Sequence, residues 1–111
     1  MNQVTLIGRL TSDLELKEGQ STSTMYTQFT LAVHRYKEER QTEFFDVVAF
    51  GKKAELLTNY TGKGRKLLVS GHLHNSFYTN VQGDKLKKTK VILEDFEFID
   101  YKKEVTTIVE A

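Results

Sequence analysis

The sequence has no cysteine, no proline and no tryptophan among its 111 residues. Without cysteine, neither a disulfide framework nor a thiolate metal site can form. No apolar run approaches the roughly 20 residues of a membrane-spanning helix. The opening segment, MNQVTLIGRL, lacks the basic start and long apolar centre of a signal peptide. We therefore expect a soluble cytoplasmic protein of one small domain that has no membrane partner.

The net charge of +1 conceals an uneven distribution along the chain. Nine basic and two acidic residues lie between Lys52 and Lys90, which gives this segment a charge of +7 and leaves −6 for the rest. Segregated charge of this kind favours a basic surface that faces a polyanion, although lysines that simply solubilise loops account for similar patterns.

The most informative stretch is TEFFDVVAFGKKAELL, residues 42–57. Its first half is rich in Phe and Val and predicts a strand over residues 43–50. After Gly51 the apolar spacing changes to three and four, which predicts a short helix. Because strand side chains alternate, large apolar groups lie on both faces of this strand. Either both faces are buried or one of them presents aromatic rings to a partner.

Alternating apolar and polar residues predict four further strands, over residues 4–10, 25–35, 65–74 and 89–99. The strand over residues 4–10 could continue past a kink through Leu14 and Leu16, and the strand over residues 65–74 could continue as far as Tyr78. Gly8 inside a strand marks a bend or a close backbone approach. Residues 36–41 read as a short charged loop, and a turn around Gly83 predicts a hairpin arm.

Five strands with one short helix between strands 3 and 4 is the order of the OB-fold, an all-β, five-stranded Greek-key barrel. An SH3-like barrel is the competing fold, but it lacks a helix at that position. We expect residues 1–100 to form the OB-fold domain and residues 101–111 a short C-terminal extension.

The chain resembles the bacterial single-stranded DNA-binding proteins from Met1 to about Ile99. The opening motif N-x-V-x-L-x-G-x-L spans residues 2–10, and TEFFDVVAFGKKAE follows at residues 42–55. Lys63-Gly64 and V-S-G-H-L at residues 69–73 then fall at the family's distances. The resemblance implies an OB-fold that assembles as a homotetramer and wraps single strands without sequence preference.

Several positions depart from the family pattern. Leu14 stands where the family commonly has proline, and the loop after Tyr36 is shorter than usual. The basic cluster that precedes the last stacking position reads His-Asn-Ser-Phe at residues 74–77, which should weaken phosphate contacts there. Lysines beyond the turn could partly compensate.

Binding without sequence preference requires flat rings for the bases and cations for the phosphates. The resemblance places stacking rings at Tyr36, Phe44, Phe50 and Tyr78. It places phosphate contacts at Arg9, Lys17, Arg35, Lys52 and Lys63, to which we add Lys85, Lys87 and Lys88. Phe45 falls at a subunit contact of the family, whereas Phe29, Phe96 and Phe98 are expected in the core. The competing interpretations are that the strand rings pack in the core and that the cations are solvated surface charges.

The sequence does not predict an enzyme, a cofactor or a metal site. His72 and His74 would share a strand face, but a two-histidine metal site needs a carboxylate that the sequence does not place. No Walker-type glycine motif is present. The alternative function is that of a tail-less primosomal replication-restart protein, which acts as a protein adaptor; an OB subunit that contacts only protein is a further alternative.

Housekeeping members of the family end in a disordered tail with an acidic tip that recruits replication and repair enzymes. Residues 101–111, YKKEVTTIVEA, do not resemble such a tail. Recruitment through a C-terminal tip is therefore not expected, and an accessory paralogue, for DNA uptake or on a mobile element, fits better than the housekeeping copy.

Overall fold

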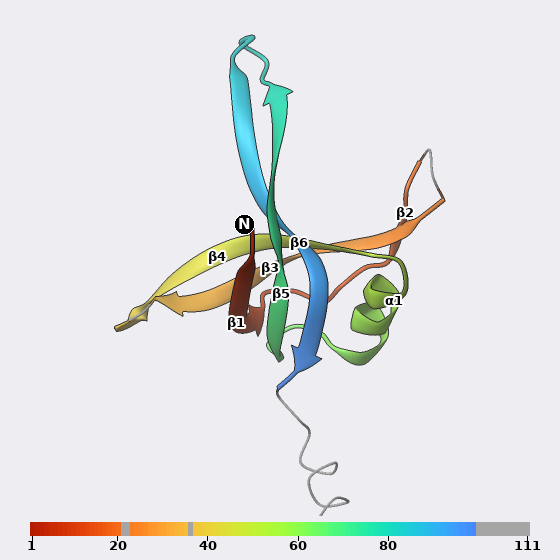
Figure 1. Cartoon of the computed structure of the whole chain (residues 1–111), viewed down its shortest axis with the longest axis vertical. Helices are drawn as coiled ribbons and strands as arrows, with labels where there is room; N and C mark the ends of the chain where they lie inside the picture. Colours follow the sequence, from red (N-terminus) through yellow and green to blue (C-terminus); the bar gives the residue numbers. More distant parts are fainter. Residues whose placement is uncertain (21–22, 36, 100–111) are drawn as a thin grey trace, which may run out of the picture.

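A computed structural model describes residues 1–20, 23–35 and 37–99 of the chain. The elements, in chain order, are β1 (Val4–Leu10), β2 (Lys17–Glu18), β3 (Met25–Arg35), β4 (Glu38–Phe50), α1 (Gly51–Tyr60), β5 (Lys66–Thr79) and β6 (Lys85–Phe98). The five long strands form the body of the molecule and α1 lies against one end of it (Figure 1).

The five long strands pair in the closed order β1-β5-β6-β4-β3. The ring closes where β1 meets β3, with Arg9 opposite Ala32 and Leu10 opposite Leu31. β4 and β6 run parallel, and the other neighbouring strands are antiparallel. A parallel pair needs a crossover connection, and α1 with β5 supplies it. This arrangement confirms the predicted OB-fold, with the two-residue β2 as an unpredicted addition.

Side chains of alternate strand residues and of α1 fill the centre of the ring. The buried residues of this core are Leu10, Phe29, Leu31, Val47, Ala49, Ala54, Leu57, Leu67, Val69, Val91 and Leu93. α1 contributes Ala54 and Leu57, three residues apart on one face, as the helical spacing requires. Phe96 and Phe98 are partly buried against this core, in an edge-to-face contact with ring centroids 5.2 Å apart.

Two glycines permit close approach of neighbouring strands. A Cβ atom on Gly8 would lie 2.4 Å from the carbonyl oxygen of Ala32, so any larger residue would push β1 away from β3 where the ring closes. A Cβ atom on Gly71 would lie 2.0 Å from the carbonyl oxygen of Ile92, beside the irregularity in the β5–β6 pairing. The close approach expected at Gly8 is therefore confirmed.

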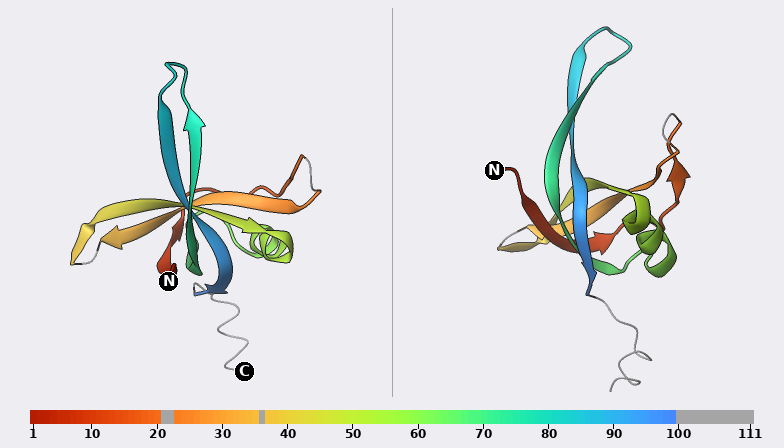
Figure 2. Two further views of the ribbon diagram at one scale, coloured as in Figure 1. Left: turned by 45° about the horizontal axis from the view of Figure 1, so that its top comes forward. Right: turned by 45° about the vertical axis from the view of Figure 1, so that its right-hand side comes forward.

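Three strand predictions were wrong in extent. β4 begins at Glu38, so most of the expected charged loop is strand that pairs with β3. β6 already begins at Lys85, earlier than predicted, whereas the continuation of β5 as far as Tyr78 and the hairpin arm are confirmed, since β5 reaches Thr79 and pairs with β6 in a long two-stranded arm, residues 74–90 (Figure 2). The first strand does not continue through Leu14 and Leu16, which lie in irregular chain and pack against the core. Outside the ring, pairing with a neighbouring strand maintains strands whose residues show no alternating apolar pattern.

Candidate nucleic-acid interface

The outward side of β4 carries two exposed rings. Phe44 and Phe50 are 63% and 48% exposed, whereas the intervening residues of opposite parity, Val47 and Ala49, are buried in the core. The register with β3 places Ala32 opposite Phe44 and Tyr26 opposite Phe50. The rings of Tyr26 and Phe50 are in contact, with centroids 6.4 Å apart. The central stretch therefore buries Val47 and Ala49 on one face, whereas the other face exposes Phe44 and Phe50 on either side of the buried Val48.

The arm adds a further ring to this side of the molecule. Tyr78, 51% exposed, is directly opposite Leu86, and Ser76 is opposite Lys88. Directly paired residues of antiparallel strands point to the same side, so these four side chains share one side of the arm. The Lys88 ammonium lies 3.6 Å from the carboxylate of Asp46, which stands between Phe44 and Phe50 on β4. The Tyr78 side of the arm is thus continuous with the exposed side of β4, and we call this surface the aromatic face.

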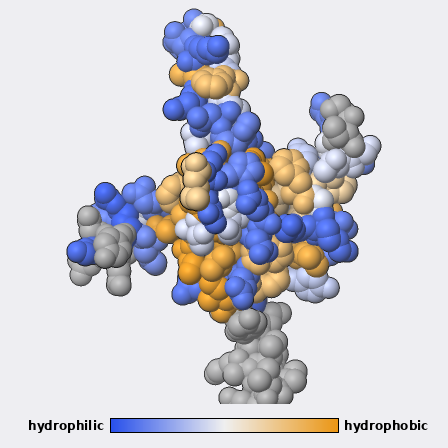
Figure 3. Space-filling view, viewed as in Figure 1, coloured by the Kyte–Doolittle hydropathy of each residue, from blue (hydrophilic) through white to orange (hydrophobic). Residues whose placement is uncertain are grey.

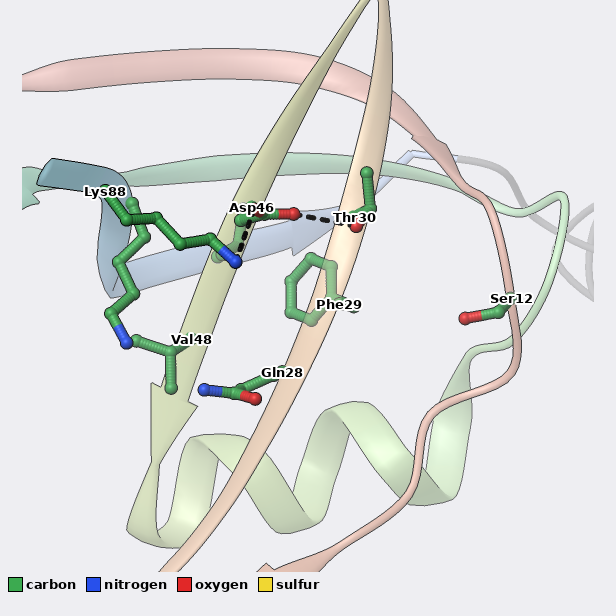
Figure 4. A pocket seen from close by; sticks show the side chains of 9 residues that line it. Ser12, Gln28, Phe29, Thr30, Asp46, Val48 and Lys88 are labelled. Carbon is green, nitrogen blue, oxygen red and sulfur yellow. Dashed lines mark hydrogen bonds and ion pairs between the residues drawn. The ribbon is translucent and has the colours of Figure 1, made fainter. Parts of the chain in front are cut away.

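Two adjoining hollows line the aromatic face. The first, about 250 Å³, is lined by Gln28, Thr30 and Asp46 of β3 and β4 and by Lys88 and Lys90 of β6. In Figure 4 the Lys88 side chain extends toward Asp46. The second, about 280 Å³, shares Gln28 and Lys90 with the first and extends to the rings of Tyr26 and Phe50. Together they form an open groove over β3 and β4 that has polar walls and an aromatic end.

The opposite side of the arm carries a residue that sequence reasoning missed. Phe77 is 62% exposed, with the Lys85 ammonium 5.8 Å from its ring centroid, a cation–π distance. Lys87 is directly opposite Phe77. Of the three arm lysines predicted together, only Lys88 therefore lies on the aromatic face. Strand alternation around Tyr78 was the available signal, because it places residues 77 and 78 on opposite sides.

The other predicted cations are dispersed. Lys17 of β2 is opposite Tyr26 and so lies beside the aromatic end of the groove, and Lys52 follows Phe50 by two residues at the start of α1. Arg9 donates from Nη1 to the carbonyl oxygen of Gly64 at 2.9 Å, and Arg35 forms an ion pair with Glu43 at 3.1 Å. Lys63 lies in the exposed loop after α1, where its backbone N–H donates to Asp13.

Two further predicted residues are Tyr36 and Phe45. Tyr36 lies outside the described residues. Phe45, 36% exposed, points to the side of β4 opposite Phe44 and is paired with Leu31. Another exposed apolar residue is Ile7, 48% exposed on β1. Apolar residues gather over β1, whereas the arm is mostly hydrophilic (Figure 3).

The histidines and the helix bear on two other kinds of function, metal binding and membrane insertion. His72 pairs with Glu94 at 2.5 Å on the outer side of β5 and β6. Among the residues that the structure describes, no three His, Asp or Glu side chains are grouped in a way that could hold a metal ion. In the same part of the chain, no helix has the length and apolar character needed to cross a membrane.

Comparisons with known proteins identify the family to which the chain belongs. The model of the single-strand binding protein family matches residues 1–99. A single-stranded DNA-binding protein of Clostridium perfringens is 42% identical over 100 residues, which cover 90% of this chain and 67% of the relative. Single-stranded DNA-binding protein 2 of Clostridium acetobutylicum is 41% identical over 107 residues, covering 94% and 80%. The replication-restart alternative is not favoured by these matches. The chain belongs to the single-strand binding protein family.

Proposed function

We propose that this protein binds single-stranded DNA across the aromatic face, with little preference for base sequence. The observation that carries the proposal is the continuity of exposed rings and lysines from β4 onto the arm. Phe44, Phe50 and Tyr78 supply flat apolar surfaces, and Lys88 and Lys90 lie between them. Every base has a π face and every nucleotide carries a phosphate, so such a surface suits any sequence. The relatives are named for the same ligand.

The geometry favours single strands over duplex. In a duplex the base faces are stacked on one another, and a ring on a protein surface reaches only the edges and the phosphates. A single strand can place its bases on Phe44 or Tyr78 while its phosphates meet the lysines. The function is binding and protection of single strands in replication, recombination, repair or DNA uptake. It involves no catalysed reaction and no cofactor, and its expected location is the cytoplasm, with the nucleoid.

We also propose that the protein acts as a homotetramer. Among the residues that the structure describes, β1 pairs with β3 at Arg9 and Leu10, and no strand pairs with that edge of the segment Val4–Gly8. An unpaired edge with the half-exposed Ile7 beside it suits contact with a second copy. Phe45 is a second candidate contact. One small OB surface covers about 4–16 nucleotides, so several linked sites are needed for tight wrapping.

Competition between single strands and duplex tests the proposed function. The protein is titrated into labelled oligo-dT while unlabelled single strands or duplex of equal length compete. We expect single strands of dT and dC to compete similarly and duplex to compete far more weakly. The affinity should also fall as salt rises, with a slope of roughly 0.7 per phosphate contacted. Equal competition by duplex, or binding that does not respond to salt, would contradict the proposal.

A further inference from the structure

The aromatic face contains one acidic side chain in an unexpected place. Asp46 lies on the same side of β4 as Phe44 and Phe50, two residues from the first and four from the second. At about 3.3 Å per residue, the carboxylate stands roughly 7 Å along the strand from one ring and 13 Å from the other. A DNA strand that stacks on both rings therefore passes over a negative charge.

Neighbours on both sides hold the Asp46 carboxylate in place. The hydroxyl of Thr30, directly opposite on β3, donates to Oδ1 at 2.9 Å. The Nζ atom of Lys88 lies 3.6 Å from Oδ2, so the two oxygens have different partners (Figure 4). The side chains of Asp46 and Lys88 are 46% and 60% exposed, so an incoming phosphate can reach the pair.

We propose that Asp46 limits the affinity of the aromatic face for single-stranded DNA by neutralising Lys88. This inference rests on the proposed function. Lys88 lies on the same side of the arm as Tyr78, and its charge is directed at Asp46. A phosphate that contacts Lys88 must displace the carboxylate, and Asp46 then remains beside the DNA backbone as a like charge. Both effects weaken binding.

The exposure of the Asp46–Lys88 ion pair determines how much Asp46 lowers the affinity for single-stranded DNA. Exposed ion pairs contribute little, so a phosphate can displace Asp46 from Lys88. The free energy lost to the exchange is therefore modest, and because Asp46 already neutralises Lys88, the main consequence is one fewer net charge–phosphate contact that releases a counterion. Since each such contact contributes about 0.7 to the salt slope on single strands, the slope is a second and independent measure of the inference.

A purely structural role for the ion pair makes a different prediction. Asp46 and Lys88 connect β4 to β6 close to the point where the arm leaves the ring, and Thr30 connects β3 to β4. If the carboxylate served only to fix these strands, its removal would lower stability and binding together. Asp46→Asn separates the two roles, because the amide oxygen still accepts the Thr30 hydrogen bond while the charge is lost.

The test measures oligo-dT and oligo-dC binding by wild type, Asp46→Asn and Asp46→Ser, from roughly 50 to 200 mM salt. We expect both variants to bind about fivefold more tightly at low salt, equivalent to ~1 kcal/mol. The salt slope should increase by about 0.7 for both oligonucleotides. Lys88→Ala should then lower affinity by a larger factor in the Asp46→Asn background than in wild type, because only there is the ammonium free.

Glu97→Gln is the matched control, since it makes the same change in net charge near the end of β6 farthest from the arm. We expect it to bind like wild type. The inference is overturned if the folded Asp46 variants bind no more tightly than wild type, or if Glu97→Gln gives the same gain. It is also overturned if the affinity rises for only one of the two oligonucleotides and the salt slope is unchanged. That result would indicate that Asp46 contacts a base. Failure of wild type to bind any single strand would instead contradict the proposed function.

Discussion

Phe77 and Tyr78 are neighbours in the sequence, yet they lie on opposite sides of the arm. Tyr78 faces the same side as Lys88, which reaches Asp46 on β4, whereas the ring of Phe77 lies under the ammonium of Lys85. The two rings have similar exposure, 51% for Tyr78 and 62% for Phe77. They therefore form a matched pair in which only the side of the arm differs, and this makes them suitable for locating the path of DNA.

Replacement of Tyr78 by Ala should weaken oligo-dT binding by on the order of 1–3 kcal/mol, the value of one lost stack. Phe77→Ala removes an exposed ring of similar size from the other side of the arm and should cost clearly less. Neither change should lower the melting temperature by much, because both rings lie outside the core. Titration of each variant against labelled oligo-dT measures the difference. A larger loss for Phe77→Ala would show that the strand follows the other side of the arm.

Phe44→Ala should also lower the affinity by about 1–3 kcal/mol while leaving the domain folded. The ring is the most exposed of the three on the aromatic face and packs little against its neighbours. Thermal unfolding and binding are measured on the same preparation. If stability falls instead and binding per folded molecule is unchanged, Phe44 belongs to the packing of the domain and not to the interface.

Phe45→Ala should act on assembly rather than on the stacking surface. Its ring points away from Phe44, and its partial exposure suits a contact with another subunit. We expect wild type to have the mass of a tetramer by light scattering at micromolar concentration and Phe45→Ala to shift the mass downward. Phe44→Ala is the control and should keep the mass of wild type. A monomeric wild type would exclude the tetramer.

Thr27→Val should stabilise the protein. Thr27 is fully buried opposite Ala49, and its hydroxyl is a buried polar group without a hydrogen-bond partner in the described part of the chain. Such a group costs roughly 1–3 kcal/mol, and valine has the same shape and is equally favourable in a strand. We expect the midpoint of thermal unfolding to rise by several degrees. Thr27→Ser keeps the hydroxyl but loses a methyl group, so it should be less stable than wild type. If Thr27→Val were less stable than wild type, the Thr27 hydroxyl would have a hydrogen-bond partner, which would contradict the prediction.

The sequence predicted the ring and its helix because alternating apolar residues in short strands leave few other folds. It did not predict the full length of β4 and β6. Their outer parts are charged, such as Lys85 to Lys90, and are maintained by pairing with a neighbouring strand rather than by burial. Local composition carries little signal for pairing of that kind, so the turn around Gly83 predicts a hairpin arm but not how far its polar strands extend.

The sequence predicted the residue types of the candidate site, but not the side of the arm on which each residue lies. Lys85, Lys87 and Lys88 look alike in the sequence. Only the cross-strand register shows that Lys88 lies on the opposite side of the arm from the other two. Asp46 drew no attention because its role depends on Lys88, which lies 42 positions further along the chain. Contacts between distant strands follow from closure of the ring, and no local pattern encodes them.

Photo-crosslinking of oligonucleotides that carry a halogenated uracil tests the central claim most directly, since the reaction favours aromatic rings that lie close to the base. The crosslinked residues are identified by mass spectrometry of the digested complex. We predict crosslinks at Phe44, Phe50 and Tyr78, on the aromatic face, and much less reaction at Phe77. Crosslinks mainly at Phe77, or at Tyr60 on α1, would contradict the account, because the strand would then cross a surface that the groove does not reach.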